Sequence, residues 1–291
     1  MTADLAQRYR VQNGKGFSLS DIDPADRGGN GLDKAKAKPL LEAGLKELVG
    51  LQERLYAEHR WALLIILQGM DTSGKDGVVK HVMAGVNPLG CMAHAFKAPS
   101  RNELDHGFLW RSQMLIPGRG HIGIFNRSYY EDVLAVRFRE VALAEEGLPP
   151  SLVTDDIWER RFGDIRAFET YLGNVGIVPI KVMLHISPGE QKKRLLARAD
   201  DPGKHWKFNA ADLDDRRLWK PYHSAYEDAI RRTATATAPW YVVPSDHKWF
   251  SRLVVASITI DTLKGLDLHF PEQTKAGREA MEAARRQLLA E

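Results

Sequence analysis

The chain has 291 residues, of which 44% are apolar and 27% are charged, and its formal net charge is +3 at neutral pH. Such a chain can bury a substantial core, and its balance of residues excludes intrinsic disorder. The small net charge gives no sign of a nucleic-acid partner, and no apolar run approaches the roughly 20 residues that cross a bilayer. Because the N-terminus lacks an apolar signal segment and Cys91 is the single cysteine, we expect a cytoplasmic protein without internal disulfides or a membrane partner.

Residues 1–60 are expected to form an arm followed by a helix. Five glycines between positions 14 and 31, without a sustained hydrophobic period, indicate an extended arm with turns over residues 1–32. From Asp33 to about Arg60, leucines recur at helical spacing. This spacing predicts a long amphipathic helix that leads into the core.

A strand and a helix begin the expected core, residues 61–271. The unbroken apolar run Ala62–Leu67 is typical of a strand buried on both faces of a parallel sheet, and a helix with Val78 and Val82 in its buried stripe follows. The alternation continues, which predicts an α/β fold, a doubly wound parallel sheet flanked by helices. The other predicted strands lie at residues 91–97, 121–125, 177–186 and 240–243, and the other helices at 103–114, 155–172, 188–199 and 249–264.

Two polar segments complete the chain. Residues 200–217 are rich in Lys, Arg and Asp and have no clear core stripe, so with their flanking helices they are predicted to form a mobile helical lid at about 188–220. Residues 272–291 are charged and rich in alanine, which predicts a solvated tail helix.

The segment between the first core strand and its helix, Gly69-Met-Asp-Thr-Ser-Gly-Lys75, has the spacing of a phosphate-binding loop. In such a loop the glycines let backbone N–H groups surround phosphate oxygens, and the helix N-terminus and the lysine add positive charge. Gly74, Asp76 and Gly77 are therefore candidate phosphate contacts beside Lys75. The alternative interpretation is a glycine-rich turn with an exposed lysine.

Asp76 occupies the position at which phosphate loops usually place the Ser or Thr that binds Mg²⁺, so other residues must hold the metal. Asp71, inside the loop, is repelled by phosphates unless a cation lies between them, and carboxylate oxygens suit Mg²⁺. We therefore predict that Asp71 is a metal ligand. The alternative is that Asp71 caps a turn.

A second polar cluster, Asn126-Arg-Ser-Tyr-Tyr-Glu-Asp132, follows the strand predicted at 121–125. Ligands bind at this edge of doubly wound sheets, and the expected neighbour is the phosphate-loop strand. Arg127 would neutralise charge on the transferred phosphoryl group, Asp132 is the second candidate magnesium ligand, and Glu131 would orient the acceptor or assist the metal. Capping of a helix explains the two acids equally well.

Basic residues of the lid form the third group of candidates. They could close over a polyanion, exclude water and align phosphates, whereas a solvated helix face is the alternative. Nearby Trp206 and Phe208 are expected to pack within the lid rather than to stack on a base. The basic candidates are Arg194, Arg198, Lys204 and Lys207.

Three motifs together resemble polyphosphate kinase family 2, and the similarity extends from about Tyr9 to Pro271. The resemblance implies a fold like that of thymidylate kinase and dependence on Mg²⁺, with Mn²⁺ as its substitute. It also implies reversible transfer of the terminal phosphate of inorganic polyphosphate to AMP or ADP, which gives ADP or ATP. The motifs are Gly69-Met-Asp-Thr-Ser-Gly-Lys-Asp-Gly77, Phe125-Asn-Arg-Ser-Tyr-Tyr-Glu-Asp-Val-Leu134 and Asp201-Pro-Gly-Lys-His-Trp-Lys-Phe208.

By position, the resemblance implies that Asp71, Lys75 and Asp132 are catalytic, with both acids at magnesium. It places Arg127 and the basic lid residues in contact with phosphates. Asn126 and the acidic pair that follows it resemble the single-domain class that phosphorylates both AMP and ADP. Family members form dimers or tetramers, so a homo-oligomer is expected.

An ATP-dependent nucleoside monophosphate kinase is the main alternative, because its loop, lid arginines and fold class would look similar. The arrangement of Asp71 and Asp76 around Lys75 favours the polyphosphate family. A nucleotide-binding module without turnover is the second alternative, and two metal-directed acids beside a lid argue against it. We predict direct in-line transfer without a covalent intermediate. The sequence leaves open the preferred base and the phosphate that occupies the loop.

Overall fold

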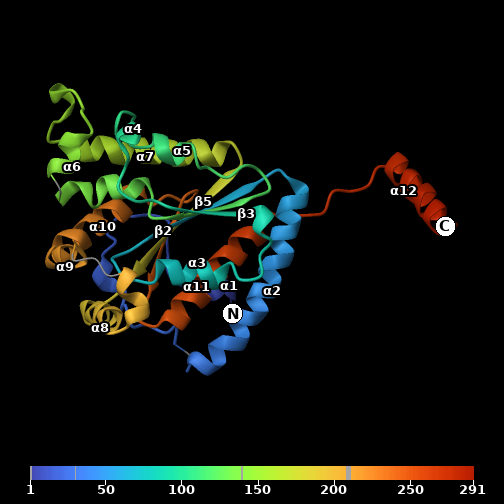
Figure 1. Ribbon diagram of the computed structural model, residues 1–291, viewed down its shortest axis with the longest axis horizontal. Helices are drawn as coiled ribbons and strands as arrows, with labels where there is room; N and C mark the ends of the chain where they lie inside the picture. The colour runs from blue at the N-terminus through green and yellow to red at the C-terminus, as the bar shows by residue number, and fades with distance from the viewer. Residues whose placement is uncertain (1, 30, 139, 208–210) are drawn as a thin grey trace.

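A six-stranded sheet runs through the residues that the computed structural model describes, which are 2–29, 31–138, 140–207 and 211–291 (Figure 1). Neighbouring strands from β6 to β3 are parallel, as predicted, whereas β1 adds an antiparallel edge that the sequence did not reveal. The order across the sheet is β1 (Arg10–Val11), β6 (Trp240–Pro244), β5 (Ile177–His185), β2 (Ala62–Gln68), β4 (Ile122–Asn126) and β3 (Cys91–Ala95).

The central strand β2 is buried on both faces, which explains its unbroken apolar sequence. Leu63, Ile65 and Leu67 contribute to one hydrophobic cluster, and Leu64 and Ile66 contribute to the other. Side chains alternate across a strand, so this one segment anchors both cores.

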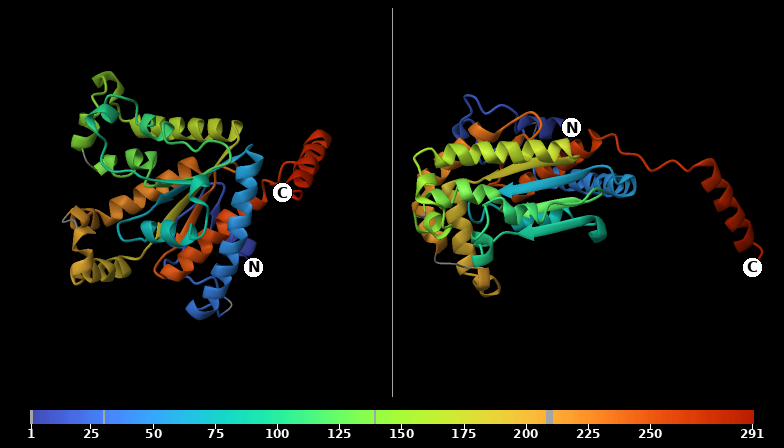
Figure 2. Two further views of the ribbon diagram at one scale, coloured as in Figure 1. Left: turned by 45° about the vertical axis from the view of Figure 1, so that its right-hand side comes forward. Right: turned by 90° about the horizontal axis from the view of Figure 1, so that it is seen from above.

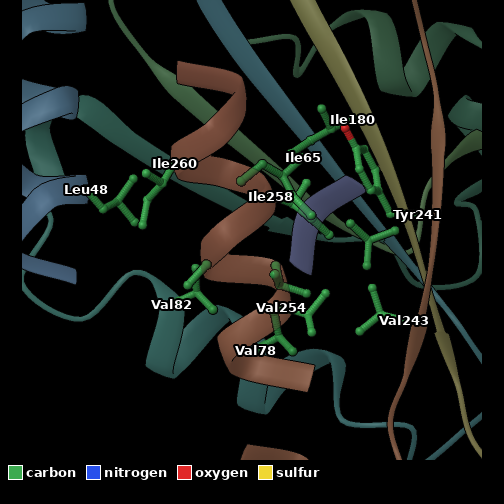
Figure 3. Packing of buried hydrophobic residues seen from close by; sticks show 14 of the residues in the cluster. Leu48, Ile65, Val78, Val82, Ile180, Tyr241, Val243, Val254, Ile258 and Ile260 are labelled. Atoms are coloured by element: carbon green, nitrogen blue, oxygen red, sulfur yellow. The ribbon is translucent and has the colours of Figure 1, made fainter. Parts of the chain in front are cut away.

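Helices cover both faces of the sheet, with α7 on one side and α2, α3 and α11 on the other (Figure 1). Figure 3 shows the packing on the second side, where Leu48 of α2 meets Ile260 of α11 and Val78 and Val82 of α3 lie nearby. The bounds are α2 (Lys34–Glu58), α3 (Lys75–Val82), α7 (Ile157–Asn174), α10 (Trp219–Thr233) and α11 (Lys248–Lys264).

The predicted extended arm is wrong in its first residues, which form helix α1 (Thr2–Arg8). Leu5, Ala6 and Tyr9 are buried in the cluster that also contains α11. The Tyr9 hydroxyl donates a hydrogen bond to Asp26 at 2.8 Å, which holds the following loop against the body. A helix of two turns is too short to show a period in the sequence, so its tertiary packing stabilises it.

The helix predicted at 103–114 is two short helices, α4 (Arg101–Leu104) and α5 (Trp110–Gln113). Ser100 caps the first through a reciprocal pair of contacts with Glu103. Gly107 lies in the break between them, where its low helix propensity favours a turn.

The lid region contains α8 (Pro188–Ala199), a 3-10 helix (Pro202–Lys207) and α9 (Ala211–Arg217), and α10 follows. Ser187 caps α8 by accepting a hydrogen bond from the Glu190 N–H. The sequence located α8 correctly and predicted a helix on each side of residues 200–217, but it gave no bounds for α9 or α10 and did not predict the short helix α6 (Glu140–Glu145).

The tail is helical, as predicted: α12 (Lys275–Leu288) stands away from the body and buries none of its residues (Figures 1 and 2). Thr274 caps its start. Among the described residues, no helix is both long enough and apolar enough to cross a membrane.

Candidate active site

The predicted phosphate loop lies between β2 and α3, at the carboxyl edge of the sheet. Gly69 and Gly74 adopt φ angles of 144° and 113°, which side chains with a Cβ rarely tolerate. A Cβ on Gly69 would lie 2.7 Å from the Leu184 carbonyl oxygen, so the close approach of β5 also requires glycine there. The geometry explains why the motif needs both glycines.

Lys75 is buried at the start of α3, and its ammonium group points back into the loop. Nζ donates to the carbonyl oxygens of Gly69 at 2.6 Å and Met70 at 3.3 Å. Burial, reinforced by the nearby Arg127 guanidinium, lowers the pKa of Lys75 to about 8. Thr72 Oγ1 and Ser73 Oγ are buried without a hydrogen-bond partner in the described structure, as expected of a cradle for a polar ligand.

Pairing of β2 with β4 brings the second predicted cluster to the loop. Arg127 follows β4 with a φ of 64°, a strained conformation for a residue with a side chain. Its guanidinium donates to Asp71 Oδ1 at 2.6 Å and to Glu131 Oε2 at 2.9 Å. The Glu131 carboxylate strongly raises the pKa of Arg127, so the guanidinium stays charged. Three predicted site residues therefore form one ion-pair cluster.

Glu131 is held from two sides. In the orientation that satisfies both polar atoms of its amide, Gln68 donates to Glu131 Oε1 at 2.9 Å and accepts from the Ser128 N–H at 3.2 Å. Arg127 occupies the other carboxylate oxygen. In this geometry Glu131 fixes the direction of Arg127, a contribution different from the predicted contact with acceptor or metal.

A hydrogen bond joins the end of β4 to the start of α3: Asn126 Nδ2 donates to Asp76 Oδ1 at 2.9 Å. Asp76 lies in the first turn of α3 and is exposed. The acid that replaces the usual Ser or Thr therefore joins the loop to the end of β4.

Asp132 has a carboxylate oxygen without a hydrogen-bond partner among the described residues, the buried Oδ2 atom. Burial raises the pKa of Asp132 to about 7, although Arg111 and Arg161 oppose the shift. A buried carboxylate oxygen without a hydrogen-bond partner is stabilised by either a proton or a positive ligand.

The acids present fit Mg²⁺, or Mn²⁺ in its place, because such ions are often held by one or two carboxylates together with waters and substrate phosphates. The predicted ligands Asp71 and Asp132 would supply two such carboxylates. Over the described ranges, no group of three or more His, Cys, Asp or Glu side chains forms a complete metal cage. The site therefore fits a metal that arrives with its phosphate substrate.

A cleft of about 1020 Å³ opens over the loop. Several basic side chains that line it lie outside the motifs of the sequence analysis, because they come from four different elements of the fold. They are Lys34 from α2, Lys97 after β3, Lys193 from α8, and Lys248 and Arg252 from α11. The Arg194 guanidinium lies close enough to lower the pKa of both Lys248 and Arg252, after burial as the larger cause.

Arg198, Lys204 and Trp206 of the lid line the same cleft. The expectation that Trp206 packs within the lid is wrong, because the residue is 79% exposed. The side chain of Lys207 and all of Phe208, two further predictions, lie outside the described residues.

Arg194 is buried, and its guanidinium is fully engaged by protein atoms. Its Nε donates to Glu190, and its two Nη atoms donate to carbonyl oxygens at 2.6–3.1 Å. The five N–H donors of arginine are thereby used. In this geometry Arg194 clamps the phosphate loop to the segment between β6 and α11. The acceptors are the carbonyls of Thr72, Ser73, Ser245 and Asp246.

Comparison with known proteins agrees with this arrangement. The family model of polyphosphate kinase 2 (PPK2) matches residues 31–271. The chain belongs to the polyphosphate kinase 2 family. The PPK2 crystal structure from Arthrobacter aurescens superposes with a TM-score of 0.87 at 42% identity and covers 96% of each chain. These findings confirm the resemblance and the fold class that the sequence predicted.

Two full-length relatives of this PPK2 chain carry names that state an activity. An "ADP-polyphosphate phosphotransferase" from Rhodopseudomonas palustris is 45% identical over 97% of this chain and 98% of its own length. An "AMP/ADP-polyphosphate phosphotransferase" from Meiothermus ruber is 42% identical over 93% of this chain and 97% of its own.

The two lid arginines of this PPK2 chain should respond differently to removal. We expect Arg194→Ala to lower thermal stability and kcat, because it leaves buried carbonyls unsatisfied at about 1–3 kcal/mol each. Arg198→Ala, at the cleft wall, should raise the KM for the polyanionic substrate and lower the melting temperature less than Arg194→Ala does. Steady-state kinetics and thermal denaturation of both variants check this, and equal effects on KM with unchanged stability would refute the clamp.

Proposed function

We propose that this chain is a Mg²⁺-dependent polyphosphate:nucleotide phosphotransferase that converts ADP to ATP and AMP to ADP, reversibly, with inorganic polyphosphate as donor. Its relatives from R. palustris and M. ruber carry names of this activity, and the latter name includes both acceptors. The observation that carries the proposal is the basic cleft that continues from the phosphate loop to α11 and the lid. A long polyanion needs such a series of cations, whereas one nucleotide phosphate chain needs only the loop.

The phosphate loop and Arg127 are suited to hold the reacting phosphates in line. Backbone N–H groups of the loop and Lys75 would contact the phosphate oxygens, and Arg127 would neutralise charge as the phosphoryl group moves. Asp71 and Asp132 would hold Mg²⁺, which supplies Lewis-acid stabilisation of phosphate charge when bound. Asp71 and Glu131 keep Arg127 in place before substrate binds, so little reorganisation is needed.

The direct test is an assay that contains ADP or AMP, Mg²⁺ and long-chain polyphosphate but no ATP. We expect ATP from ADP, and ADP followed by ATP from AMP, when products are separated by chromatography. Replacement of Mg²⁺ by EDTA should stop both reactions. Product that forms only when ATP is supplied with AMP would instead establish an ATP-dependent nucleoside monophosphate kinase. Light scattering of the same preparation would test the predicted dimer or tetramer.

The cations of α11 should contribute to binding of the polyphosphate chain and little to binding of the nucleotide. The double variant Lys248→Ala/Arg252→Ala is expected to raise the KM for long-chain polyphosphate about 10-fold, which corresponds to about 1.4 kcal/mol. The KM for ADP should stay within about twofold. Lys264→Ala on the exposed far end of the same helix is the matched control. A rise in the ADP KM alone would place the nucleotide, not polyphosphate, along α11.

A further inference from the structure

Behind the site, a lysine and a glutamate form an ion pair that is wholly removed from solvent. Lys181 of β5 is 0% exposed and Glu169 of α7 is 2% exposed, and Lys181 Nζ lies 2.6 Å from Glu169 Oε2. Burial lowers the pKa of Lys181, and Glu169 opposes that shift. A buried pair of this kind is seldom more stable than an apolar pair of similar volume, so its presence calls for another reason.

The second oxygen of Glu169 reaches the catalytic segment. Glu169 Oε1 accepts hydrogen bonds from the hydroxyls of Tyr129 at 3.0 Å and Tyr130 at 2.8 Å, and both tyrosines are fully buried. These tyrosines begin the 3-10 helix Tyr129–Val133, which carries Glu131 and Asp132. One carboxylate therefore fixes two consecutive residues beside the site.

The same network reaches the end of α10 and strand β6. Lys181 Nζ also donates to the Thr233 carbonyl oxygen at 2.7 Å. Thr233 Oγ1 lies 2.9 Å from the Tyr130 hydroxyl and accepts from Trp240 Nε1 at 2.8 Å. These hydrogen bonds fix the position of the 3-10 helix relative to β5, α7 and α10. Because the groups involved are buried, they cannot form hydrogen bonds to water instead.

We infer that the Glu169–Lys181 pair, acting through Tyr130, is a positioning device for the segment 127–132. The inference rests on the proposed function, because its consequence is the placement of Arg127 and Asp132 against the transferred phosphate. The strained Arg127 backbone is followed directly by Ser128 and the two anchored tyrosines, so a relaxed anchor would let the guanidinium move. A displacement of about 1 Å at a reacting group lowers a rate on the order of 100-fold.

Tyr130→Phe tests the inference, because it removes the hydroxyl and keeps the ring against Lys181. We expect kcat for ADP phosphorylation by polyphosphate to fall about 10- to 100-fold while both KM values change less than about threefold. Trp240→Phe is the matched control: it removes a hydrogen bond to Thr233 from the same buried network, keeps an aromatic ring against Tyr130 and leaves both tyrosine hydroxyls bonded to Glu169. It should lower the melting temperature comparably and keep kcat.

A second pair of variants separates charge from position. Glu169→Gln leaves Lys181 buried without a counter-ion and should fold poorly. Glu169→Leu/Lys181→Met, which removes the acceptor of both tyrosine hydroxyls together with the ion pair, should recover thermal stability but not kcat. Equal kcat in Tyr130→Phe and wild type, or recovery of kcat in the double variant, would overturn the positioning role. Wild-type protein inactive with polyphosphate would overturn the proposed function, and this inference with it.

Discussion

Lys75→Ala is expected to lower kcat about 100- to 1,000-fold, the usual cost of losing one donor that stabilises transition-state charge. The Lys75 ammonium is buried in the loop and donates to two carbonyl oxygens there, so a phosphate bound in the loop would interact with a full positive charge at short range. The loss should appear with ADP and with AMP alike. Initial rates at saturating polyphosphate measure it.

Lys80→Ala, one turn and a half further along α3 on an exposed position, is the matched control and should keep wild-type kcat. Comparable rates for Lys75→Ala and Lys80→Ala would show that the phosphate loop is not where transfer occurs. A loss confined to one acceptor would also contradict a role in the common chemical step.

The same lysine predicts the alkaline limit of activity. Burial lowers its pKa to about 8, and catalysis needs the charged form. Activity at low substrate concentration should therefore fall as pH rises through this value, and bound polyanion should move the fall to higher pH by favouring the ammonium. A profile of kcat/KM that stays flat to pH 10 would contradict the assignment.

The sequence located this part of the site because its signal is local. Strand, loop and helix follow one another from Ala62 to Val82, so apolar pattern and glycine spacing were sufficient to predict them. The meeting of Arg127 with Asp71 was also accessible, since parallel strands end at one sheet edge.

Other contributions depend on contacts that no local pattern encodes. Arg194 and the loop carbonyls that it clamps are separated by more than 120 positions, so no local pattern predicts their contact. The prediction that Arg194 binds phosphate therefore rested on its charge alone. Lys34, Lys248 and Arg252 are ordinary surface residues in sequence and become cleft residues only when α2 and α11 pack together. The Glu169–Lys181 pair gave no signal, because a Lys within a strand usually indicates an exposed edge.

Asp132→Asn should separate activity from stability. We expect kcat to fall about 100-fold or more, since a neutral amide is a poor magnesium ligand, while metal-free protein becomes more stable at neutral pH. The second effect follows from the buried Oδ2 atom, which lacks a hydrogen-bond partner in the described part of the chain. The amide removes the cost of burying an unpaired charge.

The pH dependence fixes the sign of that effect. Unfolded Asp loses its proton near pH 4, whereas burial raises the pKa of folded Asp132 to about 7. Between these values the folded state binds more protons than the unfolded state, so wild-type stability should fall as pH rises from about 4 to 7 and change little from this group outside that window. Asp132→Asn should lack this part of the decline, and Mg²⁺ should offset it in the wild type.

Thermal denaturation in EDTA across this pH range, with and without Mg²⁺, measures the difference, and Asp155→Asn on an exposed loop is the matched control. A melting temperature for Asp132→Asn that is several degrees below wild type at pH 7 would identify Asp132 as a structural anchor. A higher melting temperature together with lost activity would mean that the fold retains an unfavourable buried carboxylate because the reaction requires it, and the orphaned oxygen would then mark the metal position.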